Sequence, residues 1–132
     1  MARTRQPELV FLDTHIVCWL FAGNTELLSP AAASAIENCQ LYVSPMVELE
    51  LEYLFEIGRI TLSAKPILDN LRADIGVQIA DASFQEVVAR SRTLSWTRDP
   101  FDRIIVGHAM FANASLVTRD QAIRSNFDKA IW

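Results

Sequence analysis

Four carboxylates occupy positions in the sequence from which they could bind a divalent cation together. Asp13 directly follows the apolar run LVFL, and Asp120 comes two residues after the apolar run SLVT. Asp102 lies three residues after Asp99 in the stretch RDPFDR, and Glu50 lies within PMVELELEYLFEIG. Oxygen ligands without accompanying His or Cys favour Mg²⁺ or Mn²⁺. Such ions support phosphoryl chemistry by holding phosphate oxygens and by activating a water.

Helical geometry separates Glu50 from its three neighbouring glutamates. If residues 45–57 form a helix that ends before Gly58, Glu48, Glu52 and Glu56 share one polar stripe, which we expect to face solvent. Glu50 instead falls on the apolar face, near Met46. A buried carboxylate is costly unless it is paired, so Glu50 is predicted to have a partner or to bind metal. The alternative is that backbone N–H groups near the helix start satisfy it.

The stretch RDPFDR predicts a helix start. Pro100 suits the first helical position, which makes Asp99 the N-cap and puts Asp102 at the third helical position. This is the spacing of a capping box, so both carboxylates could be purely structural. Because Asp99 already caps the helix, we expect Asp102 to face the site. Asp13 and Asp120 have the same alternative, since each also precedes a predicted helix.

The elements around these residues alternate between strand and helix. Helices are predicted between short strands at 9–13, 41–44, 77–80 and 115–118, with a last edge strand in KAIW. The pattern predicts an α/β fold, a three-layer α/β/α sandwich with a central, mostly parallel sheet of four or five strands, formed by residues 1–132 as a single domain. Ligands of such folds collect beyond the carboxyl ends of the strands.

Composition narrows the class of protein. The 132 residues carry a net charge of −4, which disfavours binding of nucleic acid by a broad basic face but allows phosphate contact through bound Mg²⁺. No apolar run reaches membrane-spanning length, and the basic MARTRQPE is not typical of a signal peptide, so we expect a cytoplasmic protein. Cys18, Cys39 and His108 are interpreted as core residues, and His15 lacks the spacing of a metal ligand.

The motifs FLDTHIVCWLF, YVSPMVELELEYLFEIGRI, RDPFDRIIVGHAM and SLVTRDQAI together resemble the PIN-domain family, and within it the VapC-type toxins of prokaryotic toxin–antitoxin pairs. The resemblance implies a Mg²⁺- or Mn²⁺-dependent endoribonuclease whose acidic residues are Asp13, Glu50, Asp102 and Asp120. It places Thr118 beside them in a supporting role. It also implies an antitoxin that blocks the site, and a homodimer.

The sequence therefore predicts a ribonuclease that hydrolyses single-stranded or loop RNA with the help of one or two divalent ions. Arg98, Arg103 and Arg119 are candidates for phosphate contacts, with surface salt bridges as the alternative. Two other functions remain open. One is a PIN scaffold that acts by binding protein or RNA without catalysis. The other is a phosphatase with an aspartyl nucleophile, although that chemistry usually uses D-x-D where this chain has DTH.

Overall fold

A five-stranded sheet forms the centre of the molecule. The computed structural model describes residues 8–132, so the interpretation of the basic stretch MARTRQPE falls almost wholly outside the described residues. All four strand pairings are parallel, and the strand order is β3-β2-β1-β4-β5. The strands are β1 (Leu9–Leu12), β2 (Gln40–Val43), β3 (Gln78–Ile79), β4 (Ser115–Val117) and β5 (Ala130–Ile131).

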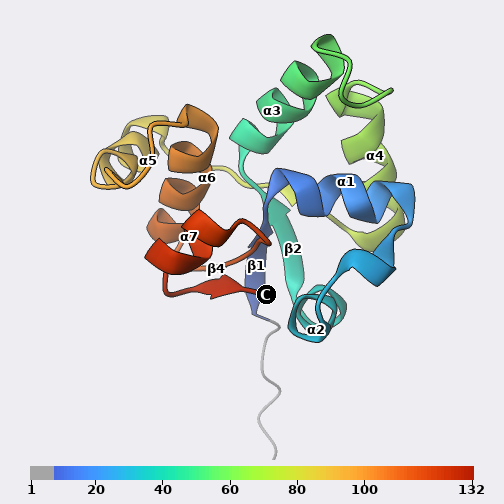
Figure 1. Ribbon diagram of the computed structural model, residues 1–132, viewed down its shortest axis with the longest axis horizontal. Coiled ribbons are helices and arrows are strands. Elements are labelled where there is room, and N and C mark those ends of the chain that lie inside the picture. The colour runs from blue at the N-terminus through green and yellow to red at the C-terminus, as the bar shows by residue number, and fades with distance from the viewer. Residues whose placement is uncertain (1–7) are drawn as a thin grey trace, which may run out of the picture.

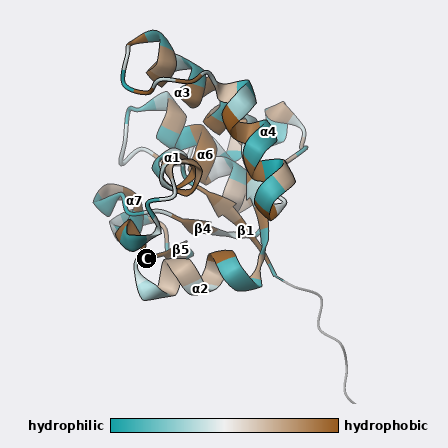
Figure 2. Ribbon diagram, turned by 90° about the vertical axis from the view of Figure 1, so that its right-hand side faces the viewer, coloured by the Kyte–Doolittle hydropathy of each residue, from teal (hydrophilic) through white to brown (hydrophobic). Residues whose placement is uncertain are grey.

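Helices cover both faces of the sheet, as predicted. In Figure 1, α5 and α6 lie on one side of the sheet, and α1, α2 and α4 lie on the other; in Figure 2, α2 runs along the lower edge of the molecule, below β4 and β5. None of the helices within residues 8–132 is long and apolar enough to cross a membrane. The helices are α1 (Thr14–Ala22), α2 (Pro30–Asn38), α3 (Pro45–Glu56), α4 (Ala64–Ile75), α5 (Phe84–Ser91), α6 (Pro100–Phe111) and α7 (Gln121–Asn126), with a short 3₁₀ turn at Thr25–Leu27.

Local sequence signals set the start of several helices. Ser29, Ser44 and Asp99 each precede a proline and each accept a hydrogen bond from a backbone N–H of the first turn. Proline suits this position because its fixed φ is helical and its missing N–H would have no partner there anyway. The helices that carry candidate site residues therefore begin where the sequence predicts.

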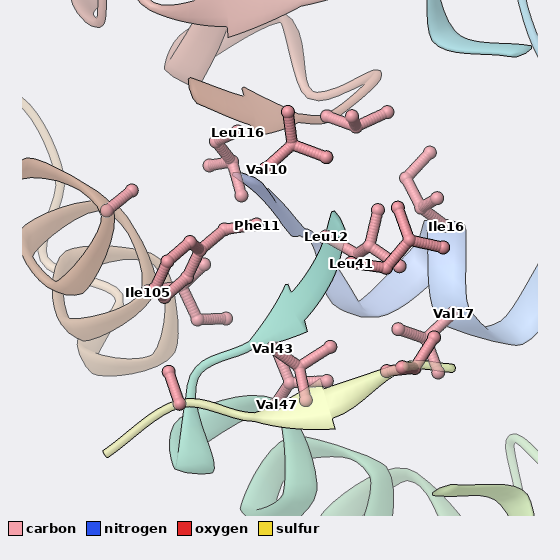
Figure 3. Packing of buried hydrophobic residues seen from close by; sticks show 14 of the residues in the cluster. Val10, Phe11, Leu12, Ile16, Val17, Leu41, Val43, Val47, Ile105 and Leu116 are labelled. Carbon is pink, nitrogen blue, oxygen red and sulfur yellow. The ribbon is translucent and has the colours of Figure 1, made fainter. Parts of the chain in front are cut away.

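The central strand β1 is buried on both faces, which explains its continuous apolar sequence. Figure 3 shows Phe11 directed toward α6, where Ile105 lies, and Leu12 directed the other way, toward Ile16 of α1. All four of these side chains are at most 1% exposed. This packing fixes the carboxyl end of β1 relative to both helical layers.

The strand order creates a crevice at one point of the sheet. From β1 the chain runs to β2 and β3 in one direction, and then returns to place β4 and β5 on the other side of β1. Helices on opposite faces diverge at such a reversal, so ligands bind beyond the carboxyl ends of the two flanking strands. Here those strands are β1 and β4. The backbone N–H of Asp13 donates to Val117 at this point, with a nitrogen–oxygen distance of 3.0 Å.

The packing of α5 against α6 depends on Gly107. A Cβ atom at this position would collide with the Ser91 side chain and lie 3.0 Å from the Ser91 backbone nitrogen. We expect Gly107→Ala to lower the free energy of unfolding by about 1–3 kcal/mol, as overpacked cores do. Chemical denaturation measures it, and adding Ser91→Ala, which removes the colliding hydroxyl, should recover part of the loss. A stability equal to wild type would contradict this packing.

Candidate active site

Asp13 lies at the carboxyl end of β1 and is 6% exposed. Its Oδ1 accepts a hydrogen bond from the Thr14 N–H at 2.8 Å, and its Oδ2 accepts one from the Thr118 hydroxyl at 2.6 Å. Burial raises the pKa of Asp13, and these two hydrogen bonds partly offset that effect. Each carboxylate oxygen offers more than one lone pair, so Asp13 can still bind a cation while it caps α1.

Thr14 connects Asp13 to Glu50. Besides its N–H bond to Asp13, the fully buried Thr14 donates its hydroxyl to Oε1 of Glu50 at 2.6 Å. The prediction that Glu50 is partly buried and has a partner is therefore confirmed, and the partner is a side chain rather than helix-start N–H groups. Burial raises the Glu50 pKa, with smaller contributions from Asp13 and Asp99 and a lowering effect of Thr14. Sequence reasoning did not single out Thr14, although its place after Asp13 in LDTH was a usable signal.

The prediction for the other glutamates of α3 is correct for two of the three. Glu48 and Glu56 are exposed. Glu52 is half-buried and accepts a hydrogen bond from the Ala64 N–H at 3.0 Å, so its predicted solvent exposure is wrong. The physical reason is that α4 begins beside Glu52, and the N-cap residue Ser63 makes no side-chain capping bond of its own.

Asp99 alone caps α6. Its Oδ1 accepts hydrogen bonds from Phe101 N–H at 2.8 Å and from Asp102 N–H at 3.4 Å. In a capping box the Asp102 side chain would in turn accept from the Asp99 N–H. That N–H donates to the Thr97 hydroxyl instead, at 3.1 Å. The Asp102 carboxylate is therefore not needed for the cap, as the sequence predicts.

Asp102 sits among like charges. Its side chain is half-buried, and burial is the largest cause that raises its pKa, which reaches about 7. The charges of Asp99, Asp13, Asp120 and Glu50 raise it further. Carboxylates that repel one another in a partly dry place hold protons more tightly. Without a cation, this carboxyl therefore holds its proton to a much higher pH than an ordinary aspartate does.

Asp120 completes the group at the carboxyl end of β4. Its Oδ1 caps α7 by accepting from the Ile123 N–H at 2.9 Å, and its own N–H donates to the Thr118 hydroxyl at 3.0 Å. Buried Thr118 thus connects Asp13 and Asp120, in the supporting position that the family resemblance implies. The capping and site interpretations of Asp120 are compatible, because a cap uses only part of its acceptor capacity.

The donor chemistry of this group fits a hard divalent cation, but the carboxylates do not form a finished coordination sphere. Within residues 8–132, no three His, Cys, Asp or Glu side chains lie close enough together to hold an ion as they stand. Over the same residues the only ion pair is Lys65–Asp69, so no salt bridge neutralises the group. Mutual repulsion keeps such carboxylates apart, and a cation would draw them together.

The remaining candidates have mainly structural surroundings. His108 is buried and shares a hydrogen bond of 3.1 Å with the Ser44 hydroxyl, as expected of a core histidine, and burial lowers its pKa. Cys18 and Cys39 are half-buried and pack against the core, so they lie at its edge rather than within it. Arg98 and Arg103 donate to backbone carbonyls, so neither the salt-bridge alternative nor a free cation describes them. Five further carboxylates are exposed: Asp69, Asp74, Asp81, Glu86 and Asp128.

Comparison with known proteins gives the same class as the fold and the site. The PIN domain family matches residues 10–127. Ribonuclease VapC22 of Mycobacterium tuberculosis is 33% identical over 121 residues, which cover 89% of this chain and 91% of that protein. The chain therefore belongs to the PIN-domain family. Its resemblance to the VapC-type members, inferred from the sequence motifs, is confirmed by this relative.

Solved structures support the fold. A VapBC2 complex from Rickettsia felis, bound to a DNA fragment from its promoter, has a TM-score of 0.60 and 20% identity, with 94% of this chain and 99% of that chain covered. A toxin–antitoxin complex from Klebsiella pneumoniae also has a TM-score of 0.60, with 18% identity and coverage of 93% and 96%. The predicted three-layer α/β/α architecture is the one these structures share.

The crowded carboxylates predict an unusual effect of pH on stability. The folded-state pKa of Asp102 is raised to about 7 from 3.8, so the folded protein binds a proton that the unfolded chain has already lost. In metal-free buffer, stability should therefore fall as pH rises from about 4 to 7. Asp102→Asn should remove part of this fall and raise stability at pH 7.5 by about 1 kcal/mol, after allowance for solvent screening, or a few degrees in melting temperature.

Melting curves of wild type and Asp102→Asn across this pH range measure the effect. Asp69→Asn, at an exposed carboxylate of a surface ion pair, is the matched control and should leave the slope unchanged. A large loss of stability in Asp102→Asn would show that the Asp102 carboxylate serves the helix cap after all.

Proposed function

We propose that this protein is a divalent-metal-dependent endoribonuclease and the toxin of a toxin–antitoxin pair, with residues 1–132 acting as one cytoplasmic PIN domain. The observation that carries the proposal is the group of carboxylates at the β1–β4 crevice, which no salt bridge within residues 8–132 reaches and where burial and like charge raise the pKa of Asp102 to about 7. The similarity to ribonuclease VapC22 supports the reaction class.

In this proposal Asp13, Glu50, Asp102 and Asp120 hold Mg²⁺ or Mn²⁺. When bound, the ion supplies charge to stabilise the phosphodiester during hydrolysis and lowers the pKa of water near it. A hard cation with oxygen ligands also offsets the repulsion that the side chains otherwise feel. Because the pKa of Asp102 is raised, binding of a cation to its carboxylate is expected to compete with binding of a proton.

The two buried threonines position the acidic side chains. Thr118 holds Asp13 and the backbone of Asp120, and Thr14 holds Asp13 and Glu50. Both hydroxyls donate to a carboxylate at 2.6 Å, which favours the ionised form. The proposed substrate is RNA, and a single-stranded or loop region of it is proposed to lie across this crevice. The sequence gives no broad basic face, so the substrate phosphate must meet the cation.

The proposed partners are an antitoxin and a second copy of the chain. The antitoxin is supported by the Rickettsia and Klebsiella structures, which are toxin–antitoxin complexes. Apolar side chains are exposed on α3, the helix that carries Glu50: Leu49 (56%), Tyr53 and Phe55. Apolar surface is also exposed around a hollow of about 290 Å³ lined by Met46, Leu49, Val87 and Phe84, which is 66% exposed, and we propose that one of these two partners covers it.

The sharpest test of the active site compares two glutamates of the same helix. We expect Glu50→Gln to lower the rate of RNA cleavage about 100-fold or more, because it removes a charged ligand from the site, whereas Glu48→Gln on the exposed side should leave the rate unchanged. Asp13→Asn should be at least as severe. Cleavage of a labelled RNA by purified protein with added Mg²⁺ or Mn²⁺ is the measurement, with a chelator as the blank.

Three results would change the assignment. Cleavage that survives both Asp13→Asn and Asp102→Asn would come from a contaminant or from another mechanism. Tight RNA binding without metal-dependent cleavage would favour the binding module. Hydrolysis of a small phosphate ester without RNA cleavage would favour the phosphatase.

A further inference from the structure

A hollow adjoins the carboxylate group on the α1 side. It has a volume of about 330 Å³ and is lined by Asp13, Asp120, His15, Trp19 and Arg119. Two of these residues are proposed metal ligands. The other three are a histidine, an indole and a guanidinium, which the catalytic proposal does not use. The hollow is therefore a place where a substrate group next to the scissile phosphate would lie.

Trp19 forms a fixed aromatic surface in this hollow. It is half-buried on α1, and its ring packs against that of Trp132 with centroids 6.0 Å apart and an angle of 54° between the planes. Both indoles also pack against the core. Because the Trp19 ring is already fixed by packing, it loses little conformational entropy when another planar group stacks on it. Nucleobases stack on such side chains in single-stranded RNA recognition.

Arg119 lies over this ring. Its guanidinium carbon is 5.9 Å from the centroid of Trp19, within range of a cation–π contact. Arg98 and Arg103 donate to backbone carbonyls, which leaves them less able to meet a phosphate. Arg119 is exposed and directly precedes Asp120, so its charge stands beside the carboxylates rather than at a distance. The guanidinium carries planar N–H donors that match phosphate oxygens, and a weak contact with the ring leaves it able to turn toward a phosphate.

We propose that Trp19 and Arg119 form a nucleotide subsite for the RNA residue adjacent to the scissile phosphate. Arg119 moves from the face of the indole to pair with the phosphate of that residue, and the base then stacks on Trp19 in its place. The subsite rests on the proposed ribonuclease function and adds to it the means of binding a single strand. A paired base could not turn onto the indole, so the subsite selects unpaired RNA.

The test measures binding apart from cleavage. A labelled dodecamer RNA with one mapped cleavage site is titrated onto protein whose cleavage is silenced by Asp102→Asn, and fluorescence anisotropy follows binding. In this background Arg119→Ala should weaken binding about tenfold and make the slope of log affinity against log salt shallower by about 0.7, the value for one lost phosphate contact on a single strand. Arg90→Ala, at an exposed arginine of α5, is the matched control and should change neither quantity.

Trp19→Leu should weaken binding by about fivefold to 100-fold, the range for one lost base stack, while leaving the salt slope unchanged. An RNA that lacks the base beside the cleavage site should show the same loss with the parent protein and no further loss with Trp19→Leu. Trp19→Phe keeps a ring and should restore most of the affinity. Because Trp19 also packs on the core, melting curves must show that each variant is folded.

The outcomes separate the subsite from the proposed function. If wild type shows no metal-dependent cleavage, the ribonuclease proposal fails and the subsite fails with it. If wild type cleaves, and folded Arg119→Ala and Trp19→Leu bind RNA as tightly as Arg90→Ala does, only the subsite is overturned. In the cleavage-competent protein, Arg119→Ala should raise KM with little change in kcat, since uniform binding is lost.

Discussion

Repulsion between carboxylates is the constraint on which this structure depends. Asp13, Glu50, Asp102 and Asp120 come from four separate segments of the chain and lie near the carboxyl ends of β1 and β4, where burial and then the charges of the other carboxylates raise the pKa of Asp102. A fold selected for stability alone would not gather these charges, since each raises the free energy of the others. The arrangement is favourable only when a cation joins it. In the absence of a cation, the residues around the four carboxylates must therefore keep these side chains in place against their mutual repulsion.

Hydrogen bonds and packing supply that restraint. Thr14 and Thr118 are buried, and each donates its hydroxyl to a carboxylate. Their positions are fixed by β1 and β4, the two strands that flank the reversal in strand order. Asp102 is held differently, because it lies in the first turn of α6, which Asp99 caps, and the backbone N–H of Asp99 in turn donates to the Thr97 hydroxyl. The close α5–α6 contact at Gly107 in turn packs α6 against its neighbour.

Much of this arrangement could be predicted from the sequence because it is encoded locally. Five apolar runs separated by capped helices gave all five strands, and the Asp-Pro pair gave the start of α6. The periodicity of α3 distinguished Glu50 from Glu48, since one lies on the apolar face and the other does not. The family match over residues 10–127 agrees with the motifs.

What local signals could not give are the contacts between distant segments. The Thr14–Glu50 bond joins α1 to α3, and the Thr118–Asp13 bond spans 105 residues of sequence. The prediction for Glu52 is wrong for the same reason. Its hydrogen-bond partner, the backbone N–H of Ala64, belongs to the start of α4, twelve residues further along the chain. The Trp19–Arg119 contact likewise joins α1 to the loop after β4. Such pairings follow from the strand order, which helix and strand patterns do not determine.

The central claim is that the carboxylates at the β1–β4 crevice form a site for a divalent cation. Calorimetric titration of the purified protein with Mn²⁺ tests it directly, without reference to any substrate. We predict saturable binding below millimolar concentrations for wild type, and binding at least tenfold weaker for Asp13→Asn and Asp102→Asn, with Asp69→Asn unchanged. No binding by wild type up to millimolar Mn²⁺, or equal binding by all four proteins, would contradict the account.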